Sequence, residues 1–188
     1  DALGTPSTSV ITSSMQVMCY GLGSCYPGRV HVMEDESNFI PQMLMAENSF
    51  TALVTHMLPT GYRDPMFGTD GRSSLPSVAG VDATTDSDGR IYVLTENAAY
   101  PAARFVTRLT STGAIDTAWA AGGTTTVPTQ FSSYSMLARL EIDSLDRLLL
   151  ASVSNDDAGI RIYRLLADDG VLDSYFGANG MRFVPIGA

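Results

Sequence analysis

Few residues in the sequence are suited to proton transfer. The only histidines are His31 and His56, although serines and aspartates are frequent enough for a Ser-His-Asp arrangement to be imagined around either one. No Gly-x-Ser-x-Gly turn is present to expose a serine as a nucleophile. Both histidines fall in stretches typical of β-strands, where ordinary packing is the simpler interpretation. The sequence therefore predicts no catalytic residue.

The two cysteines, Cys19 and Cys25, are separated by five residues that include two glycines. Glycine makes a tight reversal easy, and a reversal would bring the two Cβ atoms within disulfide reach. Metal and redox motifs use closer spacing or further ligands. A loop-closing disulfide is the favoured interpretation and two buried free thiols are the alternative. A disulfide would indicate an oxidising compartment.

Three further segments resemble ligand-binding motifs only in part. Asp86–Gly89 resembles the start of a calcium loop, but Asn97 stands where the bidentate carboxylate would be. Asn155–Asp157 is typical of a solvated loop tip, and Gly21–Gly23 lacks the third glycine of a phosphate-binding loop. Two histidines and two cysteines are too few for a convincing zinc site. We predict no metal and no cofactor, with a weak cation site at Asp86–Gly89 as the alternative.

Four arginines could line one face and bind an anionic group. They occur as two pairs in similar segments, which align Arg104 with Arg161. The chain also has 20 acidic residues, and ion pairing with these explains the arginines more simply. The four are Arg104, Arg108, Arg161 and Arg164.

The strongest signal is an internal repeat. The pattern Gly-x-x-Asp-x-x-aromatic-small-x-x-Gly occurs three times, and a proline follows each copy. These landmarks recur 52 and then 57 residues apart. Because a carboxylate in every copy suits a turn better than an active site, we assign the repeated residues structural roles. They are Asp64, Asp116 and Asp173, then Phe67, Trp119 and Phe176, then Gly71, Gly123 and Gly180, with Pro76, Pro128 and Pro185.

Short apolar runs between turn residues define the fold class. Ile91–Leu94 and Leu148–Ala151 are apolar on both faces, and Asp88-Gly89 is typical of a hairpin turn. The first copy lacks this turn signal, so we expect no hairpin turn there. Three or four short strands in every 50-odd residues predict an all-β, propeller-like fold of about three to four blades of antiparallel strands, incomplete or completed by a partner.

These segments resemble the delta-60 repeat family. The resemblance rests on Asp-x-x-Phe-Gly-x-x-Gly, on the hairpin Asp86–Leu94 and on Arg104–Leu109, and it is best across 61–180. Ala120 and Leu145-Asp146 depart from the pattern. The resemblance implies β-propeller-like arrays in secreted or surface proteins of bacteria, and it implies no shared catalytic residues.

Composition restricts the possible partners. The chain has 188 residues, a net charge of −9 and only 16% charged residues, and arginine supplies every basic side chain. Without a basic patch, nucleic acid and anionic membrane surfaces are poor partners. No apolar run is long enough to cross a bilayer.

The sequence divides into 1–34, divergent strands that contain the Cys19/Cys25 loop, and 35–188, repeats of about 35–75, 76–127 and 128–188. We expect a non-enzymatic structural or interaction subunit, secreted or periplasmic, that binds other protein subunits or copies of itself. The alternatives are a propeller enzyme acting on an extracellular glycan-like substrate and a carbohydrate- or calcium-binding module.

Overall fold

The fold comes from a computed structural model that describes residues 24–46, 49–97, 102–131, 138–154 and 159–186. Across these ranges the chain forms thirteen strands in three antiparallel sheets. No helix occurs among them, so none could span a membrane. The prediction of an all-β fold is therefore confirmed. Cys19 lies outside the described residues, and so does the predicted Cys19–Cys25 disulfide.

The first sheet is four strands wide although five strands build it. β1 and β2 both pair with β3, at opposite ends of it, and the order continues through β4 to β5. Residues 24–34 thus belong to the same sheet as the repeat segment that begins at 35. The strands are β1 (Ser24–Pro27), β2 (His31–Val32), β3 (Asn38–Ala46), β4 (Ser49–Met57) and β5 (Arg72–Leu75).

The second sheet follows the chain order from β6 to β9. Every residue of β7 is buried, as expected for a central strand with β-branched and aromatic side chains on both faces. A bulge in β6 between Gly80 and Asp82 shifts its register against β7. The strands are β6 (Ala79–Thr85), β7 (Ile91–Glu96), β8 (Ala102–Leu109) and β9 (Thr124–Phe131).

The third sheet repeats this topology from β10 to β13. Its register corresponds to that of the second sheet, because Val153 pairs with Ile160 as Glu96 pairs with Arg104. The strands are β10 (Ala138–Ile142), β11 (Leu148–Ser154), β12 (Gly159–Leu165) and β13 (Met181–Pro185).

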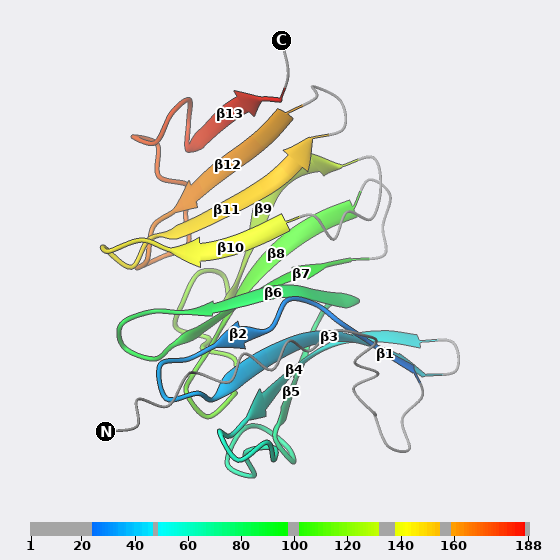
Figure 1. The fold of residues 1–188 in the computed structure, drawn as a ribbon. Coiled ribbons are helices and arrows are strands. Elements are labelled where there is room, and N and C mark those ends of the chain that lie inside the picture. The colour runs from blue at the N-terminus through cyan, green and yellow to red at the C-terminus, as the bar shows by residue number, and fades with distance from the viewer. Residues whose placement is uncertain (1–23, 47–48, 98–101, 132–137, 155–158, 187–188) are drawn as a thin grey trace, which may run out of the picture.

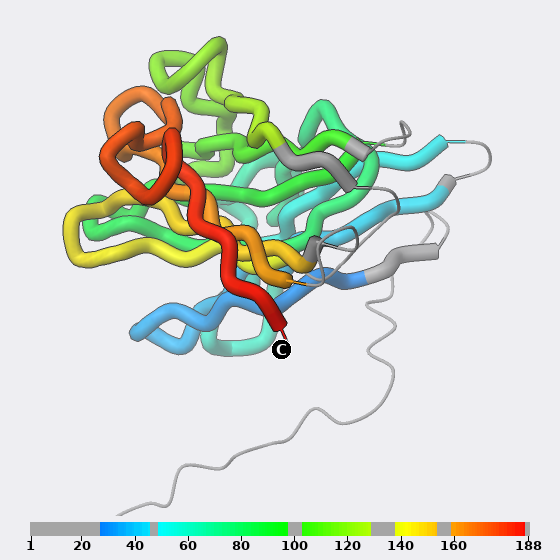
Figure 2. Tube along the Cα trace, turned by 90° about the horizontal axis from the view of Figure 1, so that it is seen from above, coloured from blue at the N-terminus to red at the C-terminus, as the bar shows by residue number. Residues whose placement is uncertain are grey.

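The three sheets stack face to face in chain order (Figure 1). Viewed along the stack, the third sheet overlies the second, and β13 crosses in front of the other strands (Figure 2). One apolar cluster fills the space between the first two sheets around Phe67, and another fills the space between the second and third around Trp119. Each sheet thus buries its apolar face only by packing against a neighbour, as expected for blade-type repeats.

The same tight hairpin joins β2 to β3, β6 to β7 and β10 to β11. The expectation that the first copy lacks it is wrong, because Met33 and Ser37 close the same turn through a backbone hydrogen bond of 2.8 Å. Glu36 adopts φ = 67° there, at the position that Gly89 holds at 75° and Asp146 at 56°. A non-glycine residue at positive φ carries little sequence signal, so the turn was not recognised.

Glycine allows a close approach between the turns of neighbouring sheets. A Cβ atom on Gly113 would lie 3.0 Å from the Phe67 ring, and one on Gly170 would lie 2.6 Å from the Trp119 ring. Both glycines have positive φ and begin the repeated turn of the next sheet. The sequence repeats glycine at this position because an aromatic ring of the preceding sheet occupies the space of a side chain.

We expect Gly170→Ala to destabilise the protein more than Gly122→Ala. Both residues have positive φ, at 67° and 71°, so each substitution carries a backbone penalty of about 1 kcal/mol. Only Gly170 also faces a ring, and the clash adds about 1–3 kcal/mol. Urea unfolding followed by fluorescence of Trp119, the only tryptophan, measures both. Equal losses in the two variants would contradict the packing role of Gly170.

Candidate interaction surface

The repeated aspartates stabilise the turns that follow β4, β8 and β12. In each copy one carboxylate oxygen accepts a backbone N–H two residues further on, and the other contacts a side chain of the preceding strand. These carboxylates are thereby occupied within the fold. The backbone contacts are Asp64–Met66 at 2.9 Å, Asp116–Ala118 at 3.2 Å and Asp173–Tyr175 at 3.0 Å. The side-chain contacts are Asp64–His56 at 3.0 Å, Asp116–Arg108 at 2.9 Å and Asp173–Arg164 at 2.8 Å.

The glycine that ends each turn adopts positive φ in every copy. The three values are 77° at Gly71, 90° at Gly123 and 86° at Gly180. A Cβ atom at Gly71 would lie 2.6 Å from a side-chain carbon of Arg63, so the turn leaves no room for one. The requirement is local and explains the recurrence without a ligand.

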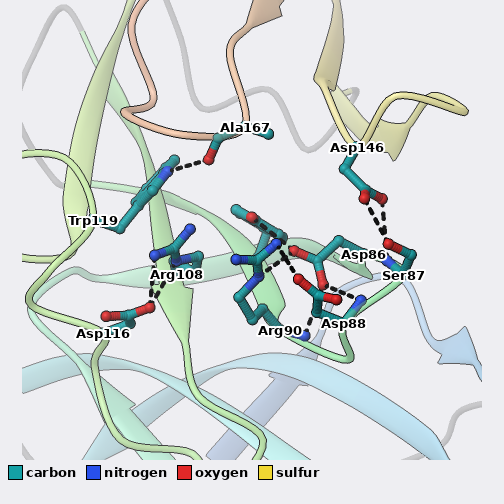
Figure 3. A network of polar contacts seen from close by, with 10 residues as sticks. Asp86, Ser87, Asp88, Arg90, Arg108, Asp116, Trp119, Asp146 and Ala167 are labelled. Carbon is teal, nitrogen blue, oxygen red and sulfur yellow. Dashed lines mark hydrogen bonds and ion pairs between the residues drawn. The ribbon is translucent and has the colours of Figure 1, made fainter.

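The aromatic residue of the turn is covered in two sheets and open in the third. Phe67 and Trp119 are fully buried under the following sheet, and the Trp119 indole donates to the Ala167 carbonyl at 2.9 Å (Figure 3). Phe176 is half-buried and lies against the guanidinium groups of Arg164 and Arg182, at 4.4 and 5.6 Å. Its neighbour Tyr175 is 95% exposed.

The same difference extends over the outward face of the third sheet, which we define as the face directed away from the second sheet. Leu75 and Val127 hold equivalent positions on β5 and β9 and are 3% and 1% exposed, whereas Val184 on β13 is 45% exposed. The register assigns six apolar residues to this outward face, all half-buried or exposed: Leu149, Ala151, Val153, Ile160, Ile162 and Val184.

A shallow hollow of about 220 Å³ lies on this face. Ala151, Val153 and Ile160 line it together with Arg139 of β10. The second sheet has Leu94, Glu96 and Arg104 at the positions of the first three, and all of these are buried. The hollow therefore occupies the place where a fourth sheet would pack. This surface is not evident from the sequence, because half-buried and fully buried positions share one residue pattern.

The four arginines do not converge on an anion site. Arg104, Arg108 and Arg164 form ion pairs with Glu96, Asp116 and Asp173, respectively. The alignment of Arg104 with Arg161 is wrong by one residue, because β12 pairs so that Ile160 takes the place of Arg104. The sequence spacing of 57 residues thus does not hold along every strand.

Glu96 and Arg104 form a buried ion pair that occurs in the second sheet only. Both carboxylate–guanidinium distances are 2.7 Å, and Arg104 also donates to Ser152 of the third sheet. Burial raises the pKa of Glu96 and lowers the pKa of Arg104, in both cases against the attraction of the partner. The first sheet has Met43 and Ala52 at these positions, and the third has Val153 and Ile160. The pair is thus an alternative to apolar packing.

A second charged cluster connects the link between β1 and β2 with β6 and β10, the innermost strands of the other two sheets. Arg29 Nη1 lies 2.7 Å from Glu141 and 3.7 Å from Asp82. The Asp82 side chain is fully buried and accepts the N–H groups of Leu140, in the next sheet, and Ala83, both at 3.0 Å. Burial raises the pKa of Asp82, and these two hydrogen bonds oppose the shift. The cluster connects strands, and its buried carboxylate is already hydrogen-bonded on both oxygens.

The hairpin of the second sheet contacts that of the third. Asp86 accepts the N–H groups of Asp88 and Arg90 on one oxygen, and the Arg90 guanidinium and Tyr92 hydroxyl on the other (Figure 3). The Ser87 hydroxyl donates to Asp146 of the third sheet at 2.6 Å. Asp86, the first expected calcium ligand, is therefore engaged by protein donors. Among the described residues no three His, Cys, Asp or Glu side chains gather as metal ligands.

Comparisons with known proteins give a distant structural similarity. No protein-family model matches the sequence, and no curated protein sequence does either. Among solved structures the chain is similar to PorZ, an essential bacterial surface component of the type-IX secretion system of Porphyromonas gingivalis. The identity is 11% and the TM-score is 0.38, over 76% of this chain and 20% of PorZ. The chain thus spans about one fifth of that protein. The resemblance to delta-60 repeats remains a prediction.

We expect Glu96→Gln to destabilise the protein by about 3–5 kcal/mol, because the Arg104 charge would stay buried without a carboxylate. The double variant Glu96→Val/Arg104→Ile carries the residues that the third sheet has at these positions. Its free energy of unfolding is expected to lie within about 1 kcal/mol of that of the unchanged protein, or above it. Urea unfolding measures both. A double variant less stable than Glu96→Gln would show that the charges are needed for more than packing.

Proposed function

We propose that the chain is a non-enzymatic interaction subunit that presents the outward face of the third sheet to a partner protein. The observation that carries the proposal is the exposure of Val184 at 45%, where Leu75 and Val127 are buried. The repeat places the same kind of side chain at all three positions. Two of these side chains are covered by the next sheet, so the third belongs to a surface suited to being covered.

The composition of the face supports a protein partner. Its centre is aliphatic on β11 and β12, and Arg139, Arg164 and Arg182 lie toward its edges. An apolar centre with a polar rim, and arginine and tyrosine at the margin, is typical of protein–protein interfaces. Ile186, 56% exposed, adds apolar area beside the uncovered edge of β13.

An interaction role also fits the repeated residues. The turn aspartates are bound within their own turns, and Phe67 and Trp119 are used in packing. These contacts favour the non-enzymatic role over a propeller enzyme. We place the subunit outside the cytoplasm, in a secreted or periplasmic location, on the basis of the predicted disulfide and the resemblance to secreted repeats.

The experiment compares two single variants in the organism that encodes the chain. Val184→Asp puts a charge on the outward face, and Leu145→Asp puts one on a hairpin side chain that is 66% exposed. Both sites are exposed, so each change is expected to alter stability by no more than about 0.5 kcal/mol. Gentle extraction followed by sedimentation measures the mass of the complex.

We expect the unchanged chain and Leu145→Asp to sediment well above the 20.0 kDa of the single chain, and Val184→Asp to sediment near that mass. A charge inside an apolar interface is not compensated by solvent, so binding is lost. If the unchanged chain sediments as a monomer, the proposed function is wrong. If both variants stay assembled, the partner binds elsewhere.

A further inference from the structure

We infer that the partner of the third sheet is a blade-type β-sheet of another protein, with a carboxylate facing Arg139 and a glycine facing Phe176. This inference rests on the proposed function and specifies its partner. It follows from the two sheet-to-sheet interfaces of the structure, which we call joints. One lies between the first and second sheets and the other between the second and third. The outward face of the third sheet presents the positions that the preceding sheet contributes to each of these joints.

The turn half of the joint requires a glycine. Phe67 lies against Gly113 and Trp119 lies against Gly170, in each case too closely for a side chain on the glycine. Phe176 occupies the same repeat position, and no described residue covers it in that way. A partner that buries Phe176 as its equivalents are buried must present a residue without a side chain.

A hydrogen bond across each joint fixes the register of that turn. The Ser73 hydroxyl donates to the Gly113 carbonyl at 2.7 Å, and the Thr125 hydroxyl donates to the Gly170 carbonyl at 3.1 Å. The register of β13 puts Arg182 at the equivalent position. Its guanidinium is also a donor, so it can serve the carbonyl of the partner's glycine in the same way.

The inner half of the joint requires a negative charge. Arg139 on β10 holds the register position of Asp82 on β6, and Arg29, in the link between β1 and β2, lies beside Asp82, so the sign of the charge alternates from sheet to sheet. Arg29 lies beside Asp82, and Asp82 accepts the Leu140 N–H of the following sheet. Arg139 is exposed and donates to its own neighbour Ala138. A carboxylate in the following sheet would continue the alternation.

A second copy of this chain fits the joint poorly. Its first sheet offers Gly61, whose surroundings are open, but it also places Arg29 opposite Arg139. Like charges at that position oppose docking. The corresponding face of the first sheet is also already covered, because Ile40 and Leu53 are only 3% and 7% exposed. A second copy of this chain is therefore disfavoured as the source of the partner sheet.

The chain itself supplies a surrogate for this partner. Residues 77–131 include a four-stranded sheet in which Gly113 lies against Phe67 of the preceding sheet and Asp82 lies 3.7 Å from Arg29 of that sheet. Pro76 comes directly after β5 and Pro185 is the last residue of β13, at equivalent points of the repeat. A second copy of residues 77–131 joined directly after Pro185 therefore extends the stack by one sheet. The matched control is the same extended chain with Asp82→Arg in the added copy only.

We expect amide hydrogen exchange in β12 and β13 to slow by about tenfold or more in the extended chain, because the added sheet covers their outward face. The Asp82→Arg control should lose most of this protection. A second extended chain, with a Gly-Ser pair inserted after Pro185, guards against a strained junction. Unchanged exchange in both extended chains would overturn the inference, and full protection in the control would overturn the carboxylate requirement.

The two tests separate the inference from the proposed function. Protection in the extended chain, together with a monomer in the native organism, would leave the face competent to dock a sheet but remove the assembly role. Assembly in the organism without protection in the extended chain would exclude a blade-type partner. Sedimentation of the unextended chain as a dimer that Arg139→Glu strengthens or Val184→Asp abolishes would identify the partner as a second copy instead.

Discussion

The fold depends on one constraint: a four-stranded sheet of this repeat has an apolar face that only another sheet can cover. A sheet of about fifty residues has too little apolar interior to be stable alone, so burial between sheets supplies most of the stability. The aromatic–glycine contacts show how closely that packing is fitted. The Phe67 and Trp119 rings each occupy the space that a Cβ atom on the facing glycine of the next sheet would need. The remaining features of the chain adjust this joint or leave it open.

Much of the fold was predictable because turns and buried strands repeat with local signals. Apolar runs such as Ile91–Leu94 indicated central strands, and Asp88-Gly89 indicated the hairpin of the second sheet. The first hairpin was missed because Glu36 adopts positive φ without a glycine, stabilised by backbone hydrogen bonds that the sequence does not reveal. The one-residue shift that replaces Arg104 with Ile160 was missed because loop lengths differ between copies.

The interaction surface could not be predicted from sequence for a different reason. A side chain that packs against a neighbouring sheet and one that has no sheet beside it are of the same residue type. Val127 and Val184, for example, are valines at equivalent positions of the repeat. Only the arrangement of sheets shows that one has a cover among the described residues and the other does not. Exposure is a property of the stack and is not encoded locally.

Positions at which the copies differ carry information that repeated positions do not. The turn aspartates and aromatic residues recur because every joint needs them, so they describe packing. Asp82 and Arg139 share one register position, and Arg29 lies beside Asp82, but the three side chains have different roles. Arg29 pairs with an acid, Asp82 accepts an amide N–H, and Arg139 faces solvent. Charge that alternates from sheet to sheet gives each joint a polarity, which opposes stacking in the wrong order. The unmatched Arg139 therefore indicates which neighbour the third sheet would accept, beyond the fact that it has an apolar face to cover.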